Sequence, residues 1–129
     1  MRRLVLFCAL IVLSITAYGQ TLMLTVRKAA ILCEMKYYSE YELIVHAKDY
    51  LEYESKERVI AYRFKGRHCS EIYLVLDKDA ADQFIVDREG THWKKTETGW
   101  LYYSGMFEEP IIVTKIEDIS TTTFIYRLK

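Results

Sequence analysis

Hydrophobic positions between residues 21 and 38 recur at helical spacing. In the stretch TLMLTVRKAAILCEMKYY, six side chains fall on one stripe of a helix: Leu22, Val26, Ala29, Ala30, Cys33 and Tyr37. The charged residues of the stretch lie largely off this stripe, a pattern typical of an amphipathic helix. The further apolar residues Leu24, Ile31 and Met35 broaden the apolar side, so a short strand around residues 30–34 remains an alternative.

From residue 41 onward, apolar and polar positions alternate instead, and this period of two predicts β-strands. Four strands are expected over residues 41–47, 49–55, 58–65 and 69–77. Gly66 supplies the turn between the third and the fourth strand. Because the connections are short, we expect these four strands to form an antiparallel meander.

The stretch DKDAADQFIVDREG predicts a second helix over residues 79–89. Asp79 is expected to cap its first turn, and Asp82 stands where a capping box places its acidic residue. Gly90 is the expected stop at the C-terminal end of this helix.

A hairpin and two closing strands complete the predicted fold. The segments THWKK and WLYYS flank TETG, in which Gly99 suits a left-handed turn position. Strands over residues 110–118 and 121–129 join at a turn over 119–120. The predicted fold class is α+β, with an antiparallel sheet of about seven or eight strands packed on an N-terminal helix and the short helix 79–89.

The first residues predict an export signal that is cleaved from the mature protein. Arg2 and Arg3 precede an apolar run over residues 4–15, which is shorter than the roughly 20 residues that span a bilayer. Small residues at positions 17 and 19 fit signal peptidase, so cleavage after Gly19 is expected; an uncleaved anchor is the alternative. We expect residues 1–19 to be a signal peptide, residues 20–129 to form a single domain, and the protein to be secreted or periplasmic.

The balance of charge excludes two classes of partner. The chain carries 18 lysines and arginines against 18 aspartates and glutamates, and removal of Arg2 and Arg3 leaves 16 basic residues against the same 18 acidic ones. A chain this close to neutral has no bulk attraction to nucleic acid or to an anionic membrane. We therefore expect no nucleic acid partner. We also expect no membrane span after signal removal, because no longer apolar run follows the leader.

Two cysteines, Cys33 and Cys69, remain after cleavage because Cys8 lies in the leader. An even pair in an oxidising compartment predicts a disulfide, which would contribute roughly 3–4 kcal/mol to stability. The alternative is two buried thiols that act as small apolar side chains.

The hairpin around Gly99 is the predicted binding surface. A three-residue bulged loop places Trp93 opposite Tyr103 and Lys94 opposite Tyr102, so that both faces of the hairpin carry aromatic rings. A sheet packed on a helix covers only one of those faces. We expect the exposed rings to bind a sugar, a peptide or a partner protein, and the candidate residues are Trp93, Lys94, Trp100, Tyr102 and Tyr103. The alternative is cross-strand packing that supports the sheet itself.

A second candidate site lies in the stretch RFKGRHC, where Arg63, Lys65 and Arg67 gather around one turn. These side chains, with backbone donors at the turn glycine, would hold an anion. The alternative is a solvated hairpin tip. His68 and Cys69 are adjacent on a strand and point to opposite faces, which argues against a thiolate–imidazole pair.

No catalytic or metal-binding motif is present in the sequence. The three histidines have no metal-ligand spacing, and there is no phosphate or dinucleotide loop, so no metal and no cofactor are expected. The predicted function is that of an exported, non-catalytic binding protein of the bacterial envelope, which contacts an unknown protein or envelope component through an aromatic-bearing sheet face. Two alternatives remain open: a small secreted hydrolase that pairs a histidine with a carboxylate, such as His92 with Glu97 or Glu108, and a structural component whose sheet edge pairs with another chain.

Overall fold

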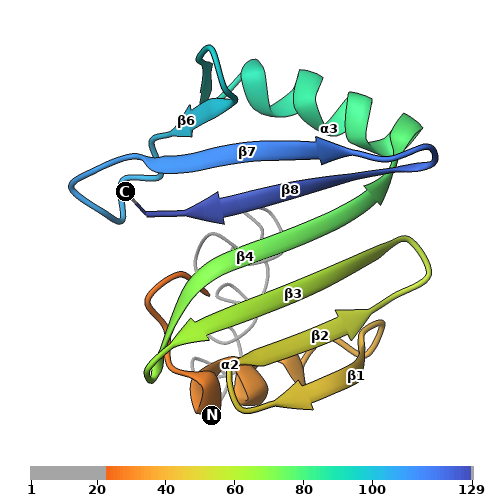
Figure 1. Cartoon of the computed structure of the whole chain (residues 1–129), viewed down its shortest axis with the longest axis vertical. Coiled ribbons are helices and arrows are strands. Elements are labelled where there is room, and N and C mark those ends of the chain that lie inside the picture. The colour runs from red at the N-terminus through yellow and green to blue at the C-terminus, as the bar shows by residue number, and fades with distance from the viewer. Residues whose placement is uncertain (1–22, 129) are drawn as a thin grey trace, which may run out of the picture.

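The structure, a computed structural model, describes residues 23–128, and the predicted export signal over residues 1–19 lies outside this range. Within it, eight strands form one antiparallel sheet in the order β1-β2-β3-β4-β8-β7-β6-β5 (Figure 1). The strands are β1 Glu42–Ala47, β2 Tyr50–Glu54, β3 Arg58–Lys65, β4 His68–Asp77, β5 Trp93–Lys95, β6 Trp100–Tyr102, β7 Ile111–Glu117 and β8 Thr121–Arg127. Two helices accompany the sheet, α2 Lys28–Met35 and α3 Lys78–Glu89. The predicted α+β class is confirmed.

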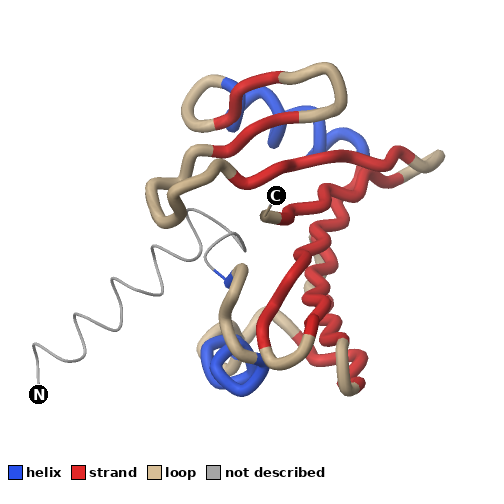
Figure 2. The backbone as a smooth tube through the Cα atoms, turned by 60° about the vertical axis from the view of Figure 1, so that its left-hand side comes forward, coloured by secondary structure: helices blue, strands red, loops and turns tan. Residues whose placement is uncertain are grey.

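Both helices lie on the same face of the sheet. From α2, the sulfur of Met35 accepts a hydrogen bond from the hydroxyl of Tyr62 on β3 at 3.6 Å. From α3, the ring of Phe84 lies 5.1 Å from the ring of Phe124 on β8. The β4 partners of Tyr62 and Phe124 are two residues apart and therefore share a face. Figure 2, which views β1–β4 closer to their edge, shows α2 to one side of these strands.

The core forms between this inner face of the sheet and the two helices. Its side chains come from alternate positions along the strands, as the period of two in the sequence predicts. The sheet residues that are at most 1% exposed are Leu51, Tyr62, Ile72, Leu74, Ile111, Val113 and Phe124. Because burial follows this alternation, the intervening side chains point to the face that the helices do not cover.

Helix α2 begins later than the sequence predicted. Thr25 has a left-handed φ of 67°, and its N–H donates to the carbonyl of Cys69 at 2.8 Å. The N–H of Cys69 donates in turn to the carbonyl of Val26 at 2.8 Å. These hydrogen bonds hold the segment before residue 28 against the start of β4. The predicted helix was therefore wrong for the described residues ahead of Lys28, because backbone pairing with a distant strand replaces the helical hydrogen bonds.

Helix α3 is close to the predicted 79–89 but has a different cap. The N–H of Ala80 donates to Oδ1 of Asp77 at 2.9 Å, so Asp77 is the N-cap and the predicted cap, Asp79, lies in the first turn. There its negative charge favours the helix N-terminus. Gly90 is the C-cap and ends the helix as predicted, with an ordinary φ of −72°.

Candidate functional site

The predicted aromatic binding surface is mostly part of the core. Trp93, Trp100 and Tyr102 are each only 4% exposed. Of the five predicted residues, Lys94 and Tyr103 are exposed, the latter at 55%. The expectation that this hairpin presents its tryptophans to solvent was wrong.

The register of the hairpin explains this burial. Trp93 pairs with Tyr102, one residue before the predicted partner, and Lys95 pairs with Trp100. Paired side chains share a face, so both tryptophans point to the side that the helices cover. On that side the Trp93 ring lies 5.4 Å from the ring of Phe84 on α3 and 5.2 Å from the ring of Trp100.

The loop of the hairpin gives Gly99 a role that differs from the predicted one. The N–H of Thr96 donates to the carbonyl of Gly99 at 2.8 Å, which closes a four-residue loop. Among the described glycines, positive φ occurs at Gly66 and Gly105 and not at Gly99. A Cβ at Gly99 would lie 2.1 Å from the carbonyl oxygen of Val113 on β7. The position therefore requires glycine because another strand approaches closely, and the predicted left-handed turn was wrong.

The face of the sheet opposite the helices, which we call the open face, carries the candidate site. Cross-strand pairing arranges its side chains in three rows that run across the strands. The first row contains Tyr50, Arg63, Glu71, Arg127, Ile112, Leu101 and Lys94. The second row contains Glu52, Ala61, Tyr73, Ile125 and Thr114, and the third contains Glu54, Val59, Val75, Thr123 and Ile116. In the second and third rows, the carboxylates stand on β2, next to the edge strand β1, and the side chains further along are apolar or aromatic except for Thr114 and Thr123.

A polar network occupies the part of the open face over β2–β4. The hydroxyl of Tyr50 donates to Oε1 of Glu52 at 2.6 Å, and the hydroxyl of Tyr73 donates to Oε1 of Glu71 at 3.2 Å. Nη1 of Arg63 lies 3.8 Å from the same oxygen of Glu71. The guanidinium of Arg63 also lies 6.0 Å from the centre of the Tyr73 ring. Such an exposed ion pair adds little stability, but the combined contacts hold the side chains in a defined pattern.

The tyrosines of this network act as hydrogen-bond donors at neutral pH. Burial, followed by the hydrogen bond with Glu52, raises the pKa of Tyr50 to about 12. Burial, followed by the negative charge of Glu71, raises the pKa of Tyr73 as well. Both hydroxyls therefore keep their protons in the physiological range, which suits recognition by hydrogen bonding.

The three residues predicted to hold an anion divide between two places. Arg63 lies on the open face beside the carboxylate of Glu71, which competes with any anion for its guanidinium. Lys65 and Arg67 are exposed at the tip of the β3–β4 hairpin. Gly66 lies between them with a φ of 66°, as its turn position requires. The anion site stays a prediction.

The two described cysteines are free thiols, so the predicted disulfide was wrong. Helix α2 buries Ile31 and Met35, and Cys33 lies between them in sequence on the opposite, exposed side. Cys69 is buried on β4, where its Sγ donates to the carbonyl of Glu71 at 3.5 Å. Burial raises the pKa of the Cys69 thiol to about 12, which leaves it protonated and unreactive at neutral pH.

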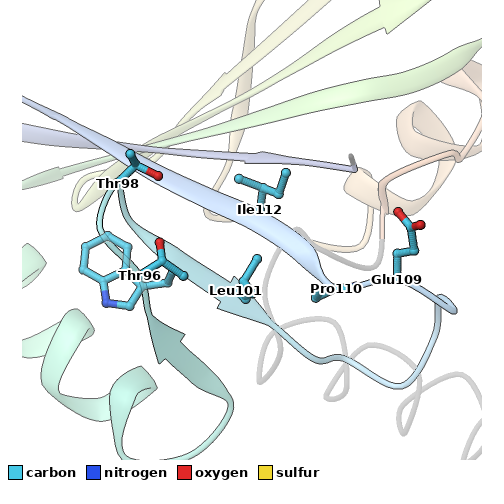
Figure 3. A pocket seen from close by; sticks show the side chains of 7 residues that line it. Thr96, Thr98, Leu101, Glu109, Pro110 and Ile112 are labelled. Carbon is cyan, nitrogen blue, oxygen red and sulfur yellow. The ribbon is translucent and has the colours of Figure 1, made fainter.

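A hollow of about 460 Å³ lies where β6 and β7 meet the open face (Figure 3). Its centre consists of Leu101 and Ile112, which pair across these two strands. Figure 3 shows the threonines of the hairpin loop at one end and the segment before β7 at the other. The remaining lining residues are Thr96, Thr98, Trp100, Glu109 and Pro110. The hollow is largely apolar, with one carboxylate at its end.

Other kinds of site are not indicated by the described part of the chain. Within residues 23–128, no cluster of three or more histidine, cysteine, aspartate or glutamate side chains is placed to hold a metal ion. His46 and His68 are exposed on different strands, and the His92 ring lies 6.0 Å from the ring of Tyr102. None of the described helices has the length and apolarity that a bilayer crossing demands. Comparisons with protein-family models, with curated proteins and with solved structures found no match.

Proposed function

We propose that this protein is an exported, non-catalytic binding protein of the bacterial envelope, and that it contacts a partner protein through the open face of its sheet. The observation that carries the proposal is the apolar and aromatic centre of a face that neither described helix covers. An antiparallel sheet with one solvated face usually places polar side chains there. Here the second and third rows place Tyr73, Val75, Ile125 and Ile116 on it instead, and Ile116 is 60% exposed.

The arrangement of side chains on the open face supports a protein partner. Protein interfaces combine an apolar and aromatic centre with a polar, charged rim. Tyr73 and Ile125 pair near the middle of the second row, while Glu52 and Glu54 lie on β2, next to the edge strand β1. A tyrosine offers a large contact area at low entropic cost, and Tyr73 is already held by its hydrogen bond to Glu71.

Site-specific photocrosslinking tests this proposal. A benzoylphenylalanine replaces Ile116 on the open face, and a matched control carries it at Val86 on α3, which is 64% exposed. In cells of the natural host, we expect a crosslinked partner from position 116 and none from position 86. Circular dichroism verifies that both proteins are folded. Equal crosslinking from both positions, or none from position 116, would contradict the proposal.

Export is tested separately by the intact mass of the protein isolated from its host. We expect a mass that corresponds to a chain beginning at Gln20. A mass that still includes residues 1–19 would contradict export by a cleaved signal, whatever the crosslinking shows.

A second candidate function, structural assembly through strand pairing, is favoured by the edge strand β1. Leu43 is 38% exposed and Ile44 is 47% exposed, and the ladder to β2 shifts between Leu43 and Val45. An exposed apolar edge is a template for pairing with another chain. Light scattering of the wild type and of Ile44→Lys tests this function. Oligomers in the wild type that the variant loses would support it, and a monomeric wild type would refute it.

A further inference from the structure

The first row of the open face places an apolar pair between two cations. Leu101 and Ile112 pair with each other, Lys94 pairs with Leu101 on one side, and Arg127 pairs with Ile112 on the other. Side chains paired in this way point to the same face. Lys94 and Arg127 are both exposed. Glu71 pairs with Arg127 from β4, but its carboxylate already lies against the guanidinium of Arg63 at 3.8 Å. Two exposed cations therefore flank the hollow.

The spacing of these cations fits an extended chain that crosses the strands. Neighbouring strands lie about 4.8 Å apart, so Lys94 and Arg127 each lie about 7 Å from the midpoint between Leu101 and Ile112. In an extended chain, residues i−2 and i+2 lie about 6.7 Å on either side of residue i and point to the same side. A residue seated in the hollow therefore brings its second neighbours over the two cations.

The charged residue that lines the hollow, Glu109, favours one direction of such a chain. Glu109 lines one end, beside Pro110 at the start of β7 (Figure 3). Its carboxylate repels an acidic residue on a chain that runs along β6 and β7. A chain that runs across these strands keeps its acidic residues over the cations of the first row and away from Glu109.

We propose that the open face over β5–β8 binds an extended segment of a partner protein in which an apolar side chain lies two residues from an acidic residue on each side. The apolar side chain occupies the hollow over Leu101 and Ile112, and the two carboxylates contact Lys94 and Arg127. This proposal rests on the proposed function, because it specifies the partner chemistry for one part of the same face.

Fluorescence anisotropy with labelled peptides tests the proposal. The probe contains the sequence Glu-Thr-Leu-Thr-Glu, and three control peptides replace both glutamates by lysine, replace the leucine by serine, or move the glutamates next to the leucine. We expect the probe to bind more tightly than each control. Equal binding of the lysine peptide, or no binding of the probe at millimolar protein, overturns the proposal.

Protein variants identify the groups responsible. Lys94→Gln and Arg127→Gln are each expected to weaken probe binding about two- to fivefold, and the double variant about tenfold, because exposed ion pairs are modest. Lys95→Gln is the matched control, since it removes the same charge from the neighbouring residue on the inner face. Glu109→Gln is expected to leave probe binding nearly unchanged, because the crossing chain keeps its carboxylates away from Glu109; a large gain in affinity would overturn the proposed direction of the chain. An effect of Lys95→Gln as large as that of Lys94→Gln overturns the proposal.

The outcome separates this inference from the proposed function. Crosslinking from position 116 does not depend on the hollow, because Ile116 lies in the third row. If crosslinking persists while the peptides show no charge or spacing preference, the binding function stands and the acidic segment is rejected. If the peptides show no preference and crosslinking from position 116 fails as well, both the acidic segment and the proposed function are rejected.

Discussion

Replacing Gly99 by alanine is expected to separate β6 from β7. The added Cβ would lie 2.1 Å from the carbonyl oxygen of Val113 and 3.2 Å from Cα of Thr114. Ordinary van der Waals contact begins at 3.4 Å, so the carbonyl oxygen of Val113 must move away from the added Cβ by more than 1 Å. Both clashing atoms belong to the backbone of β7, which is paired with β8 on its other side, so no side-chain rotation relieves the contact.

The size of the effect follows from comparison with two other glycines. Overpacking typically costs about 1–3 kcal/mol, and we expect Gly99→Ala to reach the upper end because backbone must move. At Gly66 the space is open but φ is 66°, so alanine is expected to cost about 1–2 kcal/mol through its left-handed conformation alone. At Gly90 the nearest atom would be 3.5 Å away and φ is ordinary, so alanine is expected to stabilise by about 0.4–1 kcal/mol.

Urea unfolding followed by tryptophan fluorescence measures these differences, because Trp93 and Trp100 are buried beside the altered strand and report its loss. The expected order of stability is Gly90→Ala, wild type, Gly66→Ala and then Gly99→Ala. If Gly99→Ala unfolds at the same urea concentration as Gly90→Ala, the close approach of β7 is refuted, and with it the four-residue loop of the hairpin.

Three further predictions follow from the cap and the two thiols. Asp77→Ala is expected to lower the free energy of unfolding by about 1 kcal/mol, because it removes the acceptor for the Ala80 N–H. Asp77→Asn keeps a capping oxygen and is expected to retain most of the wild-type stability; urea unfolding measures both variants. Burial raises the pKa of the Cys69 thiol from 9.0 in the unfolded chain to about 12 in the folded one. The contribution of the buried neutral thiol to the free energy of unfolding is therefore complete below pH 9 and is lost as the pH rises toward 12. Between pH 8 and pH 10 the wild type is therefore expected to lose about 1.4 kcal/mol more stability than Cys69→Ala, and an equal loss would refute this linkage. Titration of native protein with a thiol reagent is expected to modify Cys33 at once and Cys69 only after denaturant is added; no reaction at either cysteine would indicate the disulfide.

The strands were predictable because buried apolar side chains recur at every second position over long stretches. The predicted strand 58–65 coincides with β3, and the turn over 119–120 joins β7 and β8. These features depend on local patterns, namely the period of two and the residues that favour turns. Helix α3 was predicted for the same reason, although its cap lies two residues earlier because Asp77 and Asp79 are equally good capping residues by type.

The hairpin register and the start of α2 depended on distant partners. The sequence THWKKTETGWLYY allows either loop length. The choice depends on packing, in which Trp93 contacts Phe84 and Phe124 and Trp100 contacts Phe124. Similarly, the segment before Lys28 has helical spacing but bonds to Cys69, more than 40 residues later. The local pattern of apolar and polar residues does not indicate either contact.

The open face did have a signal in the sequence. Residues 59–62 and 72–76 are runs of apolar and aromatic side chains rather than strict alternations. Such runs are typical of strands that are apolar on both faces. They indicated that β3 and β4 carry a second apolar surface, and the pairing of Val59 with Val75 and of Ala61 with Tyr73 forms part of it.

The ten-residue strand β4 has a consequence for the growing polypeptide. It pairs on one side with β3 through a tight hairpin, and on the other with β8, whose Phe124 lies 50 residues beyond its partner Leu74. Until residues 121–127 have left the ribosome, the second side of β4 offers unpaired N–H and C=O groups between apolar side chains. Such an edge invites premature association with other chains. We therefore expect chains truncated before β8 to aggregate, and the nascent protein to depend on a chaperone that covers this strand.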